Sequence, residues 1–281
     1  MAKRRYGIDE DKIVQFLKEG RGQGKGNAYR PWLTIQDVPS SGRCSRIQGR
    51  KTGREHHLLS DIETSAFLLY DWSDAVADIR EQYPLDRDET RRIAAEMRVR
   101  HPLDTRSQTD IVMTTDFVLD VLGSDGGRTI ARSAKPSDEL DNDRTLEKLE
   151  IERRYWTERD TDWGLVTEHE LPEQRVKNLR WLHEMQSLEH LAAPYVGYWE
   201  DRCARFMASI RQSGGMTIKR FTQQLESTQG FATGECLTVL RHLASIKQLE
   251  FDLDAKFDMS APIEAFRVKL PAHSTRDRKT A

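Results

Sequence analysis

The stretch TTDFVLDVLGSDGGRTIARSAK, Thr114–Lys135, decides the fold of the residues around it. Two strand-like segments, Thr114–Leu122 and Arg128–Lys135, flank the turn-forming sequence GSDGG. Pro136 follows at once and cannot donate a ladder hydrogen bond within a sheet. The pattern therefore predicts a β-hairpin that ends at Lys135.

The register of this hairpin brings two side chains of opposite charge together. A turn centred between Asp125 and Gly126 places Asp116 opposite Lys135, to within a residue or two. One interpretation is an ordinary cross-strand ion pair, worth a fraction of a kcal/mol. The other is a carboxylate and an ammonium at the open end of a sheet, where they can serve chemistry.

Helices and strands are expected on both sides of the hairpin, which together predict an α/β module. A helix that starts at Ser60 carries Ile62, Ala66 and Leu69 on one face. After the hairpin, Asp141 or Asn142 can cap a helix with Leu146, Leu149 and Trp156 on one face. Strands are expected at Val76–Tyr83 before the hairpin and at Trp163–Thr167 after the second helix.

The composition changes after Pro172, where the chain becomes almost wholly helical. We therefore expect two domains, residues 1–171 and 172–281. In the second, Thr217 and Thr233 can cap successive helices, and the strand-like QLEFDLD follows them. The order helix, turn, helix, strand predicts a winged-helix-like domain, with a plain helical bundle as the alternative.

Basic residues concentrate at the N-terminal end of the chain. Residues 1–54 hold 13 Lys or Arg and 5 Asp or Glu, a net charge of +8, although the whole chain has a net charge of -2. Such a segment can lie along DNA phosphates, or it can be a solvated leader. The glycine-rich EGRGQGKG, Glu19–Gly26, lacks the Gly-Lys-Ser/Thr ending of a nucleotide-binding loop. The candidate DNA contacts are Arg21, Lys25, Arg43, Arg46, Lys51 and Arg54.

The composition also excludes several classes of protein. Hydrophobic residues make up 37% of the 281 residues and charged residues 32%, as in globular proteins with a polar surface. The apolar runs are far shorter than the roughly 18 residues of a membrane helix, and the N-terminus lacks the apolar stretch of a secretory signal. A cytoplasmic protein is expected. The three cysteines are widely spaced and predict neither a disulfide framework nor a zinc site.

Glu63 completes a possible site for phosphodiester chemistry. Ser60 and Glu63 have the spacing of a capping box, so a purely structural role is one interpretation. A helix glutamate, a strand aspartate and a lysine on the next strand are also what a phosphodiesterase needs. Two carboxylates can bind Mg²⁺, which polarises the phosphate and acidifies water, and the lysine can position or deprotonate that water.

Six segments in order give the sequence a specific resemblance to the TnsA endonuclease family. They cover most of residues 19–156. The segments are EGRGQGKGNAYRPWLTIQDVPSSGR (19–43), KTGREHHLLSDIE (51–63), DIREQYPL (78–85), TTDF (114–117), AKP (134–136) and RTLEKLEIERRYW (144–156).

This resemblance implies a restriction-endonuclease-like mixed sheet flanked by helices, followed by a winged-helix-like domain. It implies that Glu63, Asp116 and Lys135 are catalytic, with Mg²⁺ as cofactor and Mn²⁺ as a substitute. It also implies a task, the cutting of the 5′ strands of double-stranded DNA at transposon ends. The partners implied are TnsB, which cuts and joins the 3′ strands, and TnsC, an ATP-using regulator.

The sequence departs from the family pattern at one metal-binding position. The family has a glutamine two residues before the lysine, whereas this chain has Ser133, a shorter and weaker ligand. Glu152 matches a further family glutamate, although it can also be a surface residue of a charged helix. His56 and His57 resemble family positions too, and we expect them to be structural or to contact phosphate. The implied metal positions are Glu63, Asp116, Ser133, Ala134 and Glu152.

Two other functions fit the same residues. A stand-alone repair or restriction-type nuclease would share the chemistry and need no transposase. A non-enzymatic DNA-binding adaptor would use the carboxylates only for caps and ion pairs. The candidate recognition helix GECLTVLRHL carries only Arg241 and His242 as base-reading side chains, so we expect the second domain to dock a protein.

Overall fold

The computed structural model describes residues 7–38, 43–123 and 126–269. The chain forms two compact units, Met1–Leu171 and Pro172–Ala281. Across the described ranges, no helix combines the length and the apolar character needed to cross a membrane.

The centre of unit 1 is a mixed sheet in the order β3-β4-β5-β6. The sheet consists of β3 (Val76–Pro84), β4 (Thr114–Val121), β5 (Arg128–Ala134) and β6 (Asp162–Val166). The first three strands are antiparallel, which confirms the predicted hairpin, and β6 lies parallel to β5. Helix α4 (Asp143–Thr157) makes the crossover that a parallel pair requires.

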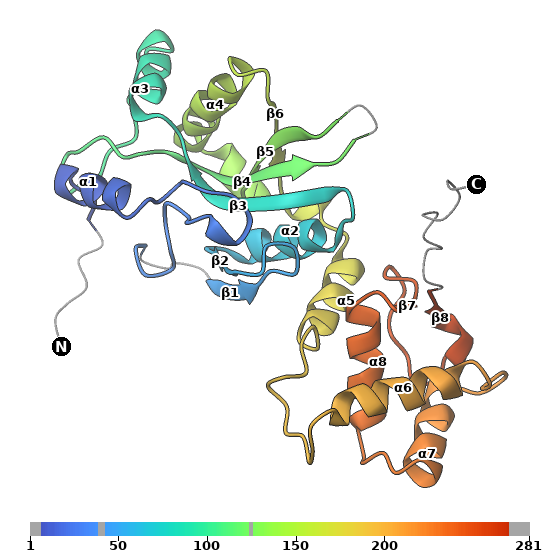
Figure 1. Cartoon of the computed structure of the whole chain (residues 1–281). Coiled ribbons are helices and arrows are strands. Elements are labelled where there is room, and N and C mark those ends of the chain that lie inside the picture. The colour runs from blue at the N-terminus through green and yellow to red at the C-terminus, as the bar shows by residue number, and fades with distance from the viewer. Residues whose placement is uncertain (1–6, 39–42, 124–125, 270–281) are drawn as a thin grey trace, which may run out of the picture. The chain divides into compact units, whose positions relative to one another are not determined.

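Helices cover both faces of this sheet (Figure 1), as in a restriction-endonuclease-like fold. On one face lie α2 (Asp61–Trp72) and the antiparallel ribbon of β1 (Ser45–Gln48) and β2 (Glu55–Leu58). There Phe67 of α2 packs with Ile79 and Phe117 of the sheet. On the other face, α3 (Arg87–Glu96) and α4 pack on Val118 and Ala131.

The N-terminal segment forms a small satellite core. Helix α1 (Glu10–Lys18) is capped by Asp9 and buries Ile13 and Phe16 against Trp32. The glycine-rich loop after it leads into a short 3₁₀ helix, η1 (Gly26–Ala28). Gly22 has a φ of 78°, and a Cβ at this position would lie 2.2 Å from Pro84 of β3. The glycine is therefore needed for close packing on the sheet edge.

The hairpin register differs by two residues from the prediction. Phe117 pairs with Arg132, and Val121 pairs with Arg128. The predicted turn residue Asp125 lies outside the described residues, but the midpoint of the connection falls one residue before the predicted one. Asp116 therefore aligns with Ser133 and not with Lys135.

Other expectations for unit 1 are partly confirmed. Ser60 caps α2, and of the two candidates for α4 it is Asn142 that caps the helix. Leu146, expected on the buried face of α4, is 46% exposed. Helix α3 and the β1-β2 ribbon were not predicted. Two short 3₁₀ helices, η2 (Ser137–Asp141) and η3 (Glu168–Glu170), complete the unit.

Unit 2 is mostly helical, as expected. Its helices are α5 (Glu173–His183), α6 (Tyr198–Ile210), α7 (Ile218–Thr228), α8 (Glu235–Ser245) and the 3₁₀ helix η4 (Ile263–Ala265), and β7 (Leu249–Glu250) pairs antiparallel with β8 (Arg267–Val268). Thr217 caps α7 as predicted. The predicted cap Thr233 is wrong, because α8 starts after Gly234, which has a φ of 88°. The expected strand QLEFDLD shrinks to Leu249–Glu250.

Candidate active site

Asp116 lies where β4 and β5 separate. The ladder between these strands ends at Phe117 and Arg132. Beyond it, the carboxylate of Asp116 accepts the backbone N–H of Ala134 at 2.7 Å and the ammonium of Lys135 at 3.1 Å. Lys135 Nζ also donates to the Ala134 carbonyl at 2.9 Å. The carboxylate–ammonium pair therefore forms even though the register differs.

Glu63 lies in the first turn of α2, where it caps the helix and also contacts Gln82. Its backbone N–H donates to Ser60 Oγ at 3.1 Å, as in the predicted capping box. Its carboxylate reaches back to accept from Leu59 N and Ser60 Oγ, each at 3.0 Å. Glu63 is only 4% exposed, so a group that merely capped the helix would be unusually buried.

Gln82 joins the two carboxylates, and the sequence interpretation did not include it. Its Nε2 donates to Glu63 Oε2 and to Asp116 Oδ1, both at 3.2 Å. Its Oε1 accepts from Thr114 Oγ1 at 3.0 Å. The only signal in the sequence was its position in DIREQYPL, one of the segments that carry the family resemblance.

Glu152 of α4 belongs to the same neighbourhood. It is 5% exposed, so its interpretation as a surface residue is wrong. Its carboxylate accepts hydrogen bonds from Thr115 Oγ1 at 2.6 Å and from Ser133 Oγ. Ser133 is only 1% exposed, and its hydroxyl donates a hydrogen bond to the Glu152 carboxylate.

The electrostatics of the cluster favour a bound cation. Burial, with the nearby charge of Asp116 as the second cause, raises the pKa of Glu63 to about 7. The same two causes raise the pKa of Glu152 to about 7. Burial alone would lower the pKa of Lys135, but the charges of Asp116 and Glu63 raise it above its usual value. One ammonium thus faces three carboxylates.

The donor set fits a hard divalent cation. Such ions take oxygen ligands from carboxylates, amides, backbone carbonyls and water. Within the described part of the chain, no three Asp, Glu, His or Cys side chains form a metal-binding group. A cation at Glu63 and Asp116 would therefore complete its shell with amide, carbonyl or water oxygens. A cavity of about 320 Å³ is lined by Asp116, Lys135 and Glu152, though not by Glu63, so it leaves room for further ligands on the Asp116 side of the cluster.

Two of the predicted DNA contacts are used inside unit 1. Arg54 has only 9% of its side chain exposed and pairs with the fully buried Glu81. Arg21, with 16% exposed, pairs with Asp37 at 2.6 Å and stacks over the ring of Phe16. These two side chains are structural, because their charges are satisfied within the fold.

The other candidate contacts are closer to solvent. Lys25 is 71% exposed and pairs with Asp120 at 2.9 Å. Arg46 lies 3.5 Å from Glu55 on the surface ribbon, Arg43 is exposed, and Lys51 is partly buried. His56, in contrast, is fully buried and bridges Thr52 and Glu81 at 2.7 Å each, which confirms a structural role.

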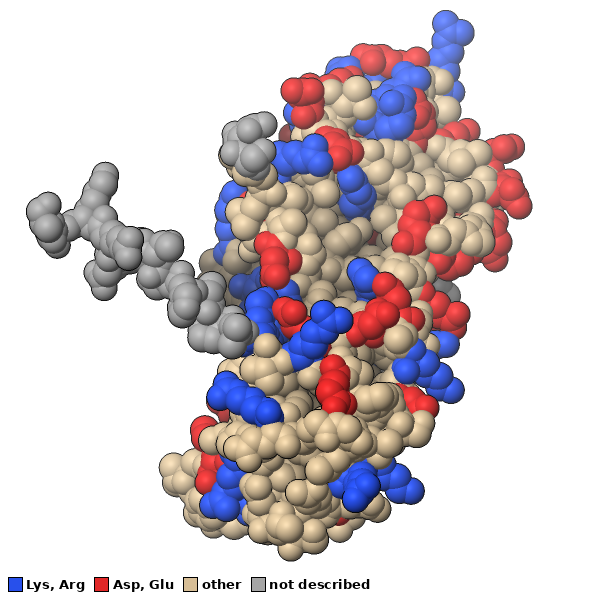
Figure 2. All heavy atoms as spheres, turned by 90° about the vertical axis from the view of Figure 1, so that its right-hand side faces the viewer, with Lys and Arg blue, Asp and Glu red and all other residues tan. Residues whose placement is uncertain are grey.

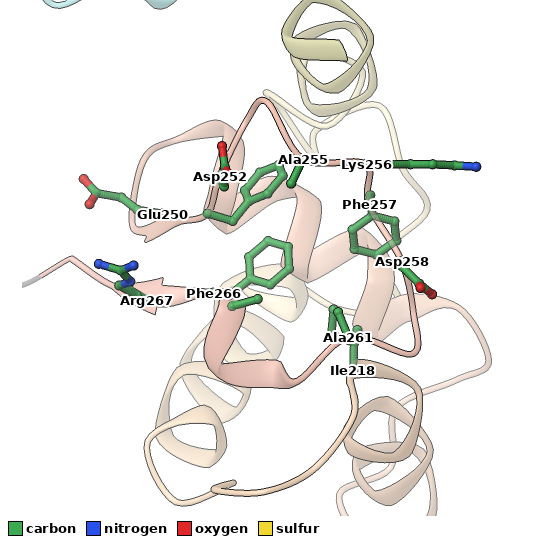
Figure 3. A pocket seen from close by; sticks show the side chains of 12 residues that line it. Ile218, Glu250, Asp252, Ala255, Lys256, Phe257, Asp258, Ala261, Phe266 and Arg267 are labelled. Atoms are coloured by element: carbon green, nitrogen blue, oxygen red, sulfur yellow. The ribbon is translucent and has the colours of Figure 1, made fainter.

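Unit 2 contains a second cavity of about 550 Å³, of a different kind. Phe257 and Phe266 face this hollow, whereas Glu250, Lys256 and Arg267 point away from it (Figure 3). The ring centroids of Phe251 and Phe266 are 4.8 Å apart. Its lining thus combines an aromatic floor with charged residues at the rim, and it contains none of the residues that the sequence predicts to be catalytic.

Comparison with known proteins agrees with this geometry. The family model for the TnsA-like endonuclease N terminus matches residues 73–168, and that for the TnsA endonuclease C terminus matches residues 170–253. The Escherichia coli protein "Transposon Tn7 transposition protein TnsA" is 38% identical over 258 residues, which cover 92% of this chain and 91% of the relative. With both units matched and a relative of this similarity over almost its full length, the chain belongs to the TnsA endonuclease family.

Proposed function

We propose that this chain is a divalent-cation-dependent DNA endonuclease that hydrolyses the 5′ strands at transposon ends. The observation that carries the proposal is the convergence of Glu63, Asp116 and Lys135 at the end of the central sheet. Glu63 and Asp116 are linked through one amide, and Lys135 donates to Asp116 at 3.1 Å. An ion pair alone would not need the second buried carboxylate.

In this proposal Glu63 and Asp116 hold Mg²⁺, for which Mn²⁺ can substitute. The bound ion would polarise the scissile phosphate and lower the pKa of water beside it. Lys135 lies beside Asp116, with its Nζ 3.1 Å from the carboxylate, and in this proposal it positions or deprotonates the attacking water.

Ser133, Ala134 and Glu152 contribute around this centre. The Ala134 N–H fixes one oxygen of Asp116, and its carbonyl faces Lys135 Nζ. Ser133 Oγ is engaged by Glu152, so any metal contact from the serine would require this hydrogen bond to open. Glu152 is the better candidate for a further oxygen ligand, because a cation would favour its ionised form.

DNA contact is assigned to the exposed basic residues of unit 1. Lys25, Arg43 and Arg46 are the candidates that remain accessible, with Lys51 partly so. Arg54 and Arg21 act indirectly, by fixing the segments that carry the others. Phosphate contacts of this kind would hold double-stranded DNA without reading its sequence.

Unit 2 is proposed to be a winged-helix-like domain that docks a protein. Helices α7 and α8 followed by the β7–β8 pair have the order of a winged helix. Arg241 donates to the Trp181 carbonyl and pairs with Glu184, and His242 bonds to the Met185 carbonyl, so both base-reading candidates are engaged. In Figure 2 the lower part of the molecule, which is unit 2, shows mostly residues other than Lys, Arg, Asp and Glu, with charged residues of both signs scattered among them. Its partner would be a TnsC-like ATPase, while a TnsB-like transposase cuts the 3′ strands.

A direct test is cleavage of a supercoiled plasmid that carries the cognate transposon ends. With Mg²⁺ and the TnsB-like partner, cuts should appear at those ends. Cutting by this chain alone would favour a stand-alone nuclease. Absence of divalent-cation binding would favour a non-enzymatic adaptor.

A further inference from the structure

Gln82 occupies an unusual place in the sheet. It lies opposite Asp116, between the pairs Glu81–Phe117 and Tyr83–Thr115. Its φ is 47°, in the left-handed region that non-glycine residues rarely adopt. A strained conformation of this kind persists only where the surroundings impose it, and it is frequent at functional sites.

The left-handed residue changes the face to which β3 directs its side chains. Ile79 packs on the α2 side of the sheet, and Glu81 contacts His56 on the same side. In a regular strand, where side chains alternate between the two faces, the Tyr83 side chain would point to this same side. It packs instead against Trp156 of α4, with ring centroids 5.8 Å apart.

Strand β4 changes face in the same row. Phe117 packs on the α2 side, whereas Thr115 accepts the indole N–H of Trp156 of α4 at 2.7 Å. Gln82 and Asp116 lie between these positions. Both are thereby directed toward Glu63 at the start of α2.

The hydrogen bonds of the Gln82 amide match its chemistry. An amide nitrogen has two hydrogens, and each finds one carboxylate, while the amide oxygen accepts the Thr114 hydroxyl. The reversed orientation would put the amide oxygen against Asp116, whose ionised carboxylate can only accept hydrogen bonds. The partners therefore fix the direction of the amide.

Buried contacts on both sides hold this backbone in place. The backbone N–H of Trp32 donates to the Gln82 carbonyl at 3.1 Å, and Tyr29 Oη donates to the Glu81 carbonyl at 3.1 Å. The carboxylate of Glu81 is fully buried between Arg54 and His56. The segment after the glycine-rich loop and this ionic cluster thus clamp the strand next to Gln82.

We propose that Gln82 is a positioning residue of the nuclease site, whose amide holds the Glu63 and Asp116 carboxylates toward each other for a divalent cation. The inference rests on the proposed function, because it assigns those carboxylates to the cation. It extends the site by one residue on a further element, β3, and gives the left-handed backbone a role.

The test is Mn²⁺ binding to the full chain, measured by electron paramagnetic resonance and calorimetry without DNA. Gln82→Met keeps the size of the side chain but removes both donors. Gln82→Gly also removes the amide, yet it suits the left-handed φ and should preserve folding. Both variants should bind Mn²⁺ about 10- to 100-fold more weakly, as is typical when a partner of metal ligands is lost.

Gln108→Met is the matched control, because Gln108 is exposed, has a φ of 56°, and bonds only locally to the Thr105 carbonyl. Its affinity for Mn²⁺ should equal that of the wild type. Equal binding by the wild type, Gln82→Met and Gln82→Gly, with Asp116→Ala weakened, would overturn the inference but leave the proposed function intact. If Asp116→Ala also bound normally, or if the wild type bound no Mn²⁺, the proposed function itself would fail.

Gln82→Glu separates positioning from direct ligation. As a positioning residue, Gln82 acts through its N–H groups, so a third carboxylate should bind Mn²⁺ no better than the methionine variant. If Gln82→Glu restored or exceeded wild-type affinity, the residue would be a direct ligand, and the positioning role would be wrong.

Discussion

Neutralising Glu81 should destabilise unit 1 strongly. Burial would raise the pKa of this carboxyl, but hydrogen bonds from Arg54 and His56 lower it to about 2. Relative to the usual 4.5, that difference corresponds to about 3 kcal/mol of stability from the ionised form. Because the folded pKa is depressed, this stability is fully present above pH 4.5 and is lost as the pH falls toward 2.

At pH 7, Glu81→Gln should therefore lower the free energy of unfolding by about 3 to 5 kcal/mol, which is the usual effect of leaving a buried charge without its partner. Glu55→Gln is the matched control, since Glu55 is 52% exposed and its ion pair with Arg46 spans 3.5 Å. Glu55→Gln should lower the free energy of unfolding by less than about 0.5 kcal/mol.

The measurement is urea unfolding of the full chain, with hydrogen exchange at β3 and β4 amides to follow unit 1 separately from unit 2. A loss of less than about 1 kcal/mol for Glu81→Gln would refute the reasoning. It would mean that the ionic cluster around Glu81 does not hold β3 in place. The left-handed backbone of Gln82 would then depend on the contacts from Trp32 and Tyr29.

Three further predictions concern DNA, pH and the partner. Replacing Lys25, Arg43 and Arg46 together by alanine should weaken DNA binding equally for all sequences. In fluorescence anisotropy, the slope of the logarithm of the binding constant against the logarithm of the salt concentration should become shallower by about 2 to 3. An unchanged slope would exclude these phosphate contacts. Burial raises the pKa of Glu63 and of Glu152 from 4.5 to about 7. The folded state therefore binds these protons more tightly than the unfolded state, and the metal-free protein should lose stability as the pH rises from about 4.5 to about 7. Mg²⁺ should restore this stability in thermal unfolding at pH 8, and no response to Mg²⁺ would contradict the site. Residues 172–281, once shown folded by circular dichroism, should co-purify with the TnsC-like ATPase, and failure would move the docking surface to unit 1.

The pattern of apolar residues predicted the hairpin and its neighbours because those strands and helices follow simple periodicities. Helix α3 escaped prediction because its sequence, RDETRRIAAE, is dominated by charge and buries only Thr90, Ile93 and Ala94. The hairpin register was missed because the turn sequence GSDGG offers several centres.

The site was predicted in part. Glu63, Asp116 and Lys135 follow from the motifs, and the structure brings them together. Gln82 could not be predicted, because its side-chain direction depends on a left-handed φ that the contacts of Trp32 and Tyr29 support. Arg54 looked like a DNA contact for a related reason: local charge does not reveal that Glu81 lies buried next to it.

Strand-resolved cleavage of labelled transposon ends tests the central claim most directly. In a complex with the TnsB-like partner and Mg²⁺, Asp116→Ala should abolish cutting of the 5′ strand, since a metal ligand is lost. Lys135→Ala should reduce the same cut while Mn²⁺ binding persists, because an ammonium cannot ligate a cation. Cuts and joins at the 3′ strand belong to the partner and should continue in both variants. Wild-type rates of 5′-strand cutting by both variants would show that Asp116 and Lys135 form only a cross-strand ion pair.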